Sequence, residues 1–276
     1  MPHWFNGTYF STDTLTLASN DPALLYGATV FTTLRVYGAS LDHPLTCWQG
    51  HHQRLTQALQ DFGWPSPDWQ SVRQGAETLL NEYPVLRITV FPDGRALVTG
   101  RNLPTDLAQM QAEGIVAWVA KGEKYARPMP GYKTGNYLGA WLALQAAQKQ
   151  GAREAILVDA QGQWLETSTG NLWGWANGQW HTPDLGAGLL PGMVRSQIIA
   201  SLTQRGERVN QAPWPPGIIQ RFEALAYSNS AVQVVPIHTV LGHTGLGHTV
   251  LGDRSRLEIN PQHPALEALR AAFEEK

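Results

Sequence analysis

Short β-rich segments joined by glycine turns recur along the chain and alternate with helical stretches. The turns are Asn6-Gly7, Pro92-Asp93-Gly94, Gln161-Gly162 and Asn177-Gly178. Asn-Gly and Asp-Gly sequences favour the tight turns that join neighbouring antiparallel strands. Apolar spacing and turn signals predict helices over residues 45–62, 71–83, 137–150, 193–205 and 266–273. The sequence therefore predicts an α+β fold whose strands are mainly antiparallel.

A stretch rich in Pro and Gly, residues 122–131, interrupts this pattern after a predicted strand at 115–120. It predicts an N-terminal α/β domain over residues 1–121, an interdomain linker over 122–131 and a C-terminal domain over 132–276. The chain has 276 residues, of which 43% are hydrophobic, so either part can bury a core of its own.

Charge and hydropathy exclude several kinds of partner. The formal net charge of −2 gives no reason to expect a nucleic acid or an anionic membrane surface. The N-terminal residues lack the basic start and apolar core of a signal peptide, and no uncharged apolar run approaches the length of a membrane span. We expect a cytoplasmic protein that acts on a small molecule.

Cysteine and histidine usage gives no sign of a metal centre. The single cysteine, Cys47, excludes an internal disulfide and a cysteine-based zinc site, and it fits a reducing compartment. Histidines that could be considered as ligands are His51, His52, His238, His243 and His248. They lack the spacing that places ligands on one helix face, so no metal is predicted.

Two charged residues suggest chemistry. Lys133 lies in a loop rich in Gly and Pro, just before a predicted helix N-terminus, where a positive charge is locally unfavourable. A lysine with a lowered pKa is a nucleophile towards carbonyl groups, since only the neutral amine attacks. Glu166 ends a predicted strand. Taken alone, a solvated loop lysine and a strand-end glutamate are the simpler explanation.

Three further features could bind an anion or an acceptor-rich ligand. Residues 186–195 form a glycine-rich loop that opens a predicted helix, where backbone N–H groups can receive a phosphate; a tight loop that caps the helix explains the pattern as well. Arg54 lies beside the apolar face of its helix and could hold a phosphate or cover apolar surface. Residues 228–230, Ser-Asn-Ser, could bind a ligand or form a plain bend.

Each of these signals is weak, but their order along the chain is specific. With it, the sequence resembles the class IV, or fold type IV, pyridoxal-phosphate enzymes, from about Asn6 to Ile237. The matching motifs are Tyr26-Gly27-Ala28-Thr29-Val30-Phe31, His51-x-x-Arg54-Leu55, Lys133-x-x-Asn136, Glu166-x-x-x-x-Asn171-Leu172-Trp173, Leu190-Pro191-Gly192-Met193-x-Arg195 and Asn229-Ser230 followed by Pro236-Ile237. The departures are Ala28, where an aspartate is common, and a short loop after the strand that contains Arg87.

The resemblance implies two α/β domains of the D-amino-acid aminotransferase-like architecture, with pyridoxal 5'-phosphate in the cleft between them and the C-terminal domain as the cofactor-binding one. It implies that Lys133 holds the cofactor covalently and moves the substrate proton, and that Glu166 keeps the pyridine nitrogen protonated. Further implied cofactor contacts come from Arg54, Tyr137, the backbone amides of Met193 and Val194, and Asn229 or Ser230. A homodimer is also implied, and the chain's 11 Trp are compatible with an interface.

Two details favour one branch of this family. The segment Phe31-Thr32-Thr33-Leu34-Arg35-Val36 resembles bacterial aminodeoxychorismate lyases, whereas branched-chain aminotransferases usually carry Phe-Glu-Gly there. Only two residues separate Lys133 from Asn136, a spacing that lyases share with D-amino-acid transaminases. The resemblance thus implies a 4-amino-4-deoxychorismate lyase of folate biosynthesis that forms 4-aminobenzoate and pyruvate. Thr32 or Thr33 could relay a proton near the leaving group, and the β-propensity of threonine explains both residues equally well.

Other assignments stay open at this point. The substrate carboxylates need cations or amides, and the candidate residues around the substrate are Tyr26, Thr32, Arg35, Arg87, Arg101 and Arg127. The alternative activity is an aminotransferase for D-amino or branched-chain amino acids. A non-catalytic relative that binds pyridoxal phosphate or a metabolite is the alternative of another class, and the presence of both Lys133 and Glu166 argues against it.

Overall fold

The computed structural model describes residues 1–242 and 256–274. The chain divides into two compact units: unit 1 is Met1–Pro104 with Tyr132–Asn136, and unit 2 is Thr105–Gly131 with Tyr137–Lys276. This division differs from the one expected after residue 121. The strand β6 (Ile115–Ala120) pairs with strands β7 and β13 of unit 2, so the backbone hydrogen bonds place it there and not in the N-terminal part.

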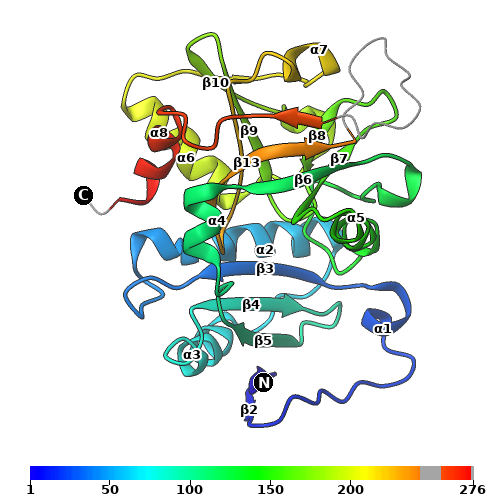
Figure 1. Cartoon of the computed structure of the whole chain (residues 1–276). Coiled ribbons are helices and arrows are strands. Elements are labelled where there is room, and N and C mark those ends of the chain that lie inside the picture. The colour runs from blue at the N-terminus through cyan, green and yellow to red at the C-terminus, as the bar shows by residue number, and fades with distance from the viewer. Residues whose placement is uncertain (243–255, 275–276) are drawn as a thin grey trace. The chain divides into compact units, whose positions relative to one another are not determined.

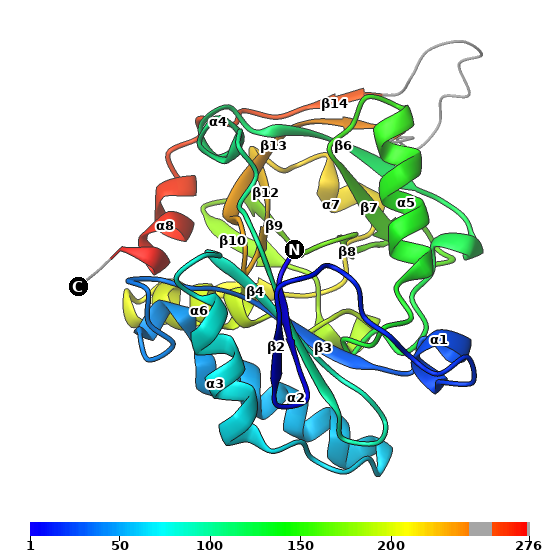
Figure 2. The ribbon, with the colours of Figure 1, turned by 90° about the horizontal axis from the view of Figure 1, so that it is seen from below.

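Unit 1 is built on a five-stranded antiparallel sheet in the order β2-β1-β5-β4-β3. The strands are β1 (His3–Phe5), β2 (Thr8–Phe10), β3 (Val30–Arg35), β4 (Val85–Val90) and β5 (Ala96–Arg101), and the helices are α1 (Pro22–Tyr26), α2 (Trp48–Phe62) and α3 (Trp69–Leu79). Helices α2 and α3 cover one face of the sheet (Figure 2), and alternate strand residues such as Leu34, Leu86 and Val98 form the core beneath them. The Asn6-Gly7 turn has positive φ at both residues, as the predicted hairpin requires.

The segment Tyr132–Asn136 forms an extra edge beside β3. The amide of Phe31 donates to the carbonyl of Lys133 over 2.8 Å, and the amide of Gly135 donates to the carbonyl of Thr29 over 2.7 Å. A side chain at Gly135 would collide with the hydroxyl of Thr29 and the carbonyl of Gly27, so only glycine allows this approach. Lys133 therefore belongs to unit 1, although the chain before Tyr132 and after Asn136 belongs to unit 2.

Unit 2 contains a mixed sheet in the order β11-β10-β9-β12-β13-β6-β7-β8, with β14 paired to β13. Besides β6, its strands are β7 (Glu154–Val158), β8 (Trp164–Thr167), β9 (Asn171–Ala176), β10 (Gln179–Thr182), β11 (Val209–Gln211), β12 (Ala224–Asn229), β13 (Gln233–Leu241) and β14 (Arg256–Glu258). The pairs β10–β11, β13–β6 and β6–β7 are parallel, and the other pairs are antiparallel. The α+β prediction is confirmed.

The helices of unit 2 pack in two groups. They are α4 (Leu107–Glu113), α5 (Leu138–Lys149), α6 (Met193–Gln204), α7 (Pro216–Ile219) and α8 (Leu266–Arg270). The described residues also form four short 3-10 helices: η1 (Pro44–Thr46), η2 (Glu123–Tyr125), η3 (Leu185–Ala187) and η4 (Ala271–Phe273). Alanines of α5 pack against β6 and β7, which lie beside it in Figure 1. Helices α6 and α8 share a second core with Trp173 and Trp180.

Candidate active site

Lys133 of unit 1 is positioned by its backbone and by an aromatic ring. Its Nζ lies 4.8 Å from the centroid of the Phe31 ring, and the guanidinium carbon of Arg87 lies 3.5 Å from the same centroid. A cation is attracted to the face of an aromatic ring, so the buried Phe31 orders two positive side chains. Together with the hydrogen bonds to β3, this arrangement holds the Lys133 amine at the edge of the sheet.

Arg54 is held by a chain of two hydrogen bonds in the core of unit 1. Its Nη2 donates to Thr32 Oγ1 over 2.5 Å, and Thr32 Oγ1 lies 2.6 Å from His51 Nδ1. A guanidinium can only donate, so Thr32 Oγ1 accepts from Arg54, and its own hydrogen stays available for His51 Nδ1. Burial, with the nearby charges of Arg54 and Lys133, lowers the pKa of His51 well below its usual range and keeps the ring neutral as an acceptor.

Three of the predicted substrate residues, all arginines, share the sheet face opposite α2 and α3 with Thr33, the predicted proton relay. In the strand register, Thr33 pairs with Arg87, and Val85 pairs with Arg35 on one side and Arg101 on the other. Side chains directly opposite on neighbouring strands point to the same face. The strand residues of β3, β4 and β5 on this face include these three arginines and no acidic residue.

The structure places the two remaining substrate candidates of unit 1 elsewhere. Thr32 lies on the core face, fully buried against Arg54 and His51. Tyr26 ends α1 and is 73% exposed. Arg127 belongs to unit 2 and pairs with a carboxylate, as described next. Thr33, Arg35, Arg87 and Arg101 are therefore the candidates that the fold gathers on one surface.

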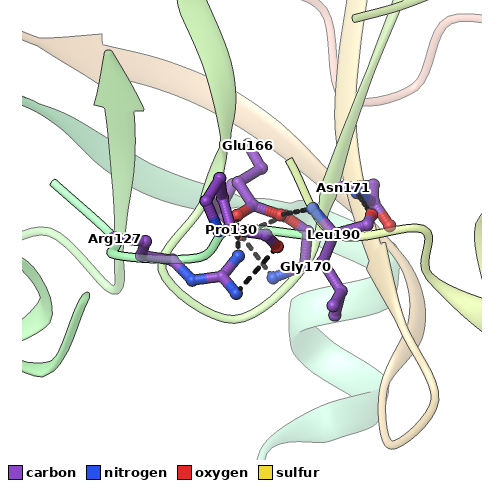
Figure 3. A network of polar contacts seen from close by, with 7 residues as sticks. Arg127, Pro130, Glu166, Gly170, Asn171 and Leu190 are labelled. Atoms are coloured by element: carbon purple, nitrogen blue, oxygen red, sulfur yellow. Dashed lines mark hydrogen bonds and ion pairs between the residues drawn. The ribbon is translucent and has the colours of Figure 1, made fainter. Parts of the chain in front are cut away.

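Glu166 of unit 2 lies in β8 with both carboxylate oxygens occupied (Figure 3). Oε1 accepts from Arg127 Nη1 in an ion pair, and Oε2 accepts from the amide of Leu190 over 3.1 Å. Arg127 also donates to the carbonyl of Pro130 over 3.1 Å, and its guanidinium carbon lies 4.7 Å from the ring centroid of Tyr137. Arg127 thus brings together Glu166 and Tyr137, two residues expected at the cofactor, and its charge stabilises the ionised carboxylate.

The loop before α6 is anchored to the strand that follows Glu166. Asn171 Nδ2 donates to the carbonyl of Leu190 over 2.9 Å, and a side chain at Gly192 would collide with Asn171 Oδ1. Gly192 is the N-cap of this twelve-residue helix, and no side chain in the described part of the chain caps it. The amides of Met193 and Val194 therefore lie at a helix N-terminus that is suited to an anion.

Asn229, at the end of β12, is used by the protein to shape a turn. Its Oδ1 accepts from the amides of Ala231 and Val232 over 2.9 and 3.0 Å, and its Nδ2 donates to Thr169 Oγ1 over 3.2 Å. Ser230 lies within this turn. We therefore expect Asn229 to organise the turn and Ser230 to face a ligand.

Across residues 1–242 and 256–274, no group of three or more His, Cys, Asp or Glu side chains could hold a metal ion. His243 and His248 lie outside the described residues. Within the same ranges, none of the helices combines the length and the apolar character needed to cross a membrane.

The family model for class IV amino-transferases matches residues 29–240, a range that includes Arg54, Lys133 and Glu166. The chain belongs to this family. It is 24% identical over 263 residues to the branched-chain-amino-acid aminotransferase of Escherichia coli strain K12, covering 87% of this chain and 84% of that protein. It is 23% identical over 233 residues to the aminodeoxychorismate lyase of Vibrio harveyi, covering 79% of this chain and 84% of that protein.

Solved structures agree with this family assignment. A pyridoxal-phosphate-bound hypothetical aminotransferase from Mycobacterium tuberculosis matches with a TM-score of 0.79 at 19% identity, over 99% of each chain. A protein provisionally named 4-amino-4-deoxychorismate lyase matches with a TM-score of 0.72 at 26% identity, over 95% of this chain and 96% of that one. The predicted fold type IV architecture is confirmed, and this class IV family member is a pyridoxal-phosphate-dependent enzyme, a transferase or a lyase.

The side chains in each unit suit that cofactor. Unit 1 offers a primary amine on Lys133 and, on Arg54, a guanidinium whose orientation is fixed by Thr32. Unit 2 offers a buried anionic carboxylate on Glu166 and an uncapped helix N-terminus at Gly192. An aldehyde, a phosphate and a pyridine nitrogen need these three kinds of partner, namely an amine, cationic or amide donors, and a carboxylate.

Sequence reasoning missed several residues that order this site. The role of Arg127 beside Glu166 was hidden because Arg127 lies in the Pro- and Gly-rich stretch, 39 positions from its partner. The contacts of Leu190 with Glu166 and Asn171 use backbone atoms, which leave no signature in side-chain identity. His51 stood in a recognised motif, and its pairing with Thr32 follows only from the packing of α2 on β3.

Proposed function

We propose that the protein is a 4-amino-4-deoxychorismate lyase that forms 4-aminobenzoate and pyruvate. The observation that carries this proposal is the face of the unit 1 sheet on which Thr33, Arg35, Arg87 and Arg101 lie together without an acidic residue. The substrate carries two carboxylates, and guanidinium groups are well suited to bind them. The names of the Vibrio harveyi relative and of the provisional lyase structure support the same activity.

We assign the chain's own residues the following tasks. Lys133 Nζ attaches the cofactor and then takes the proton from ring carbon C4 of the substrate. Glu166 holds a proton on the pyridine nitrogen, and Arg127 keeps that carboxylate in place. When bound, pyridoxal phosphate supplies a ring that accepts electrons. The Thr33 hydroxyl gives a proton to the departing enolpyruvyl group as its bond to ring carbon C3 breaks, and the remaining ring becomes aromatic.

We assign candidate phosphate donors in each unit separately. Arg54 donates from unit 1, in the orientation set by Thr32. In unit 2, the amides of Met193 and Val194 and the hydroxyl of Ser230 donate, and Tyr137 is assigned to the ring hydroxyl. These assignments rest on the motif order of the sequence.

A second candidate is an aminotransferase for branched-chain or D-amino acids. The match to the Escherichia coli branched-chain enzyme favours it, because that match covers more of the chain than the match to the Vibrio harveyi lyase, 87% against 79%. The two activities differ in their need for an amino acceptor. A lyase regenerates its cofactor at each turnover, whereas a transaminase stops after one half-reaction unless a 2-oxo acid is present.

The test is to incubate the cofactor-loaded protein with 4-amino-4-deoxychorismate in the absence of any 2-oxo acid. We expect continuous release of 4-aminobenzoate, with pyruvate formed in equal amount. A parallel mixture holds a branched-chain or D-amino acid with 2-oxoglutarate. Glutamate formation there, without 4-aminobenzoate in the first mixture, would establish the aminotransferase instead. Lys133→Ala is the control in both mixtures and should give neither product.

The homodimer and the cytoplasmic location also stay predictions. Leu138 and Trp141 are 59% and 54% exposed on one side of α5, and large apolar side chains so exposed are typical of an interface. We propose that a second copy of the chain covers them.

A further inference from the structure

Glu154 is a buried carboxylate that the proposed reaction does not use. It begins β7 and is 2% exposed. Its Oε1 accepts from the Ser168 hydroxyl and from the amide of Ala155, the latter over 3.0 Å, and its Oε2 accepts from the Thr169 hydroxyl. Ser168 and Thr169 lie in the turn between Glu166 and Asn171, so Glu154 lies against the turn that joins these two site residues.

Within the described part of the chain, each hydrogen-bond partner of the Glu154 side chain is a donor. A carboxylate accepts at both oxygens, and a glutamine in its place would present an N–H group to at least one of these donors. Burial raises the pKa of Glu154, and the hydrogen bonds from Ser168, Thr169 and Ala155 act in the opposite direction. The surroundings of Glu154 therefore require a side chain that accepts hydrogen bonds at both of its terminal atoms, and a carboxylate meets this requirement whereas a carboxamide does not.

A directed chain of hydrogen bonds leads from Glu154 to the turn after β12. Because the Thr169 hydroxyl gives its proton to Glu154, Thr169 Oγ1 is left to accept from Asn229 Nδ2, which lies 3.2 Å away. The amide oxygen of the same side chain accepts from the backbone N–H groups of Ala231 and Val232, so the contact with Thr169 agrees with the orientation that these two amides require. The chain of hydrogen bonds from Glu154 therefore ends on the side chain that shapes the turn containing Ser230, and it adds a further contact that favours the same orientation of Asn229.

Backbone contacts fix the rest of the same turn. The amide of Ser168 donates to the carbonyl of Ala155 over 2.8 Å, and a side chain at Gly170 would collide with the carbonyl of Ser228. The Ser168–Thr169 segment is therefore held between β7 and β12. The hydroxyl hydrogens of Ser168 and Thr169 can still rotate, and the carboxylate of Glu154 fixes their direction by accepting from both.

We propose that Glu154 is a positioning residue for the cofactor phosphate, which it serves by orienting Asn229 and Ser230 through Thr169. The inference rests on the proposed binding of pyridoxal phosphate by that turn. It predicts that a change at Glu154 weakens the binding of a ligand that carries the phosphate and leaves the binding of a ligand without it unchanged. The reason is that the chain of hydrogen bonds ends at the turn assigned to the phosphate and does not include Lys133 or Glu166.

The experiment compares the binding of pyridoxal phosphate and of pyridoxal, which lacks the phosphate, to the cofactor-free full-length chain. The variants are Glu154→Gln and Thr169→Val. We expect each to weaken pyridoxal phosphate binding by about tenfold, as the loss of a charge-assisted hydrogen bond would, and to leave pyridoxal binding within about twofold of wild type. The double variant should be little weaker than either single one, because both changes break the same chain.

Thr169 is exposed, so its substitution leaves the core intact. Thr169→Ser keeps the hydroxyl and should retain wild-type affinity. Matched controls are Glu113→Gln and Thr203→Val, whose exposed side chains form hydrogen bonds with Gln109 and with the carbonyl of Ile199, each within its own helix. Unchanged pyridoxal phosphate affinity in Thr169→Val, or equal losses for both ligands, would overturn the positioning role. If the wild-type chain itself bound pyridoxal phosphate no better than pyridoxal, the assignment of the phosphate site would fail instead.

Discussion

Arg127 and Glu166 form an ion pair whose side chains are only 5% and 6% exposed. Glu166 also accepts from the Leu190 amide, and Arg127 also donates to the Pro130 carbonyl. Three segments of unit 2 therefore meet at one carboxylate and one guanidinium, namely the loop with Arg127 and Pro130, the strand with Glu166 and the loop with Leu190. Removing one member of such a pair leaves an uncompensated charge in a site from which water is excluded.

Arg127→Met should accordingly destabilise the protein by about 3–5 kcal/mol. The measurement is chemical denaturation of the cofactor-free chain. The double variant Arg127→Met with Glu166→Gln should recover part of the loss, because it leaves no isolated charge. Equal stability of Arg127→Met and wild type would mean that the pair contributes nothing to folding.

Lys133 should carry the cofactor. Borohydride reduction of the loaded protein, followed by peptide mass mapping, should place a pyridoxyl group on the peptide that contains Lys133. Lys133→Ala should abolish this label, whereas Lys124→Ala, a change at an exposed lysine of η2, should leave it in place. A label on another lysine of the wild-type chain would refute the assignment.

Thr32 should affect cofactor binding through Arg54. Thr32→Val removes the acceptor of the 2.5 Å hydrogen bond from Arg54 and should weaken pyridoxal phosphate binding by roughly 0.5–1.5 kcal/mol. Thr32→Ser should restore it. In a chain that already carries Arg54→Ala, Thr32→Val should weaken pyridoxal phosphate binding little further, because the guanidinium that Thr32 orients is absent. Thr78→Val, at an exposed hydroxyl of α3 that bonds only to its own helix, is the control. A full Thr32 effect without Arg54 would show that the two act separately.

His51 should make unit 1 sensitive to acid. Its pKa in the folded chain lies well below the ordinary value of 6.5, so below about pH 6.5 the unfolded chain binds a proton that the folded chain does not. The free energy of unfolding is therefore unaffected by His51 above about pH 6.5. It falls by up to about 1.4 kcal/mol per pH unit as the pH drops from there towards the pKa of His51 in the folded chain. Denaturation at pH 5, 6, 7 and 8 should show a shallower slope for His51→Gln. Identical slopes would contradict the prediction.

The exposed side of α5 should belong to a dimer interface. Trp141→Glu places a charge where a second copy is expected to pack, and it should shift the sedimentation of the protein from dimer to monomer. Gln148→Glu changes charge at an exposed position of the same helix and should leave the dimer intact. A wild-type chain that sediments as a monomer while active would refute the dimer itself.

The regular parts of the fold were predictable because they depend on local pattern. The helix expected over residues 193–205 is α6, and the strand expected over 115–120 is β6 with the same bounds. The elements that were missed are short: α4 has seven residues and β11 has three. In segments of that length, tertiary pairing outweighs local propensity, and the sequence gives too few residues to establish a period.

Parts of the site were predictable for a different reason. Lys133 and Glu166 could be proposed as site residues because their motifs occur in a fixed order, which a sequence records directly. The domain boundary was misplaced because the pairing of β6 with β13 joins residues more than 100 positions apart. Glu154 escaped attention because a single acidic residue at a strand start has no pattern, and only its burial beneath Ser168 and Thr169 distinguishes it.

The edge formed by Tyr132–Asn136 beside β3 has a consequence for dividing this protein into fragments. A polypeptide that stops at Pro104 would contain all five strands of the unit 1 sheet but would leave the amide of Phe31 and the carbonyl of Thr29 without their partners on Lys133 and Gly135. Such an unprotected strand edge recruits other chains and promotes aggregation. Supplying the missing five residues as a peptide fused by a short linker should convert an insoluble fragment into a monomeric one.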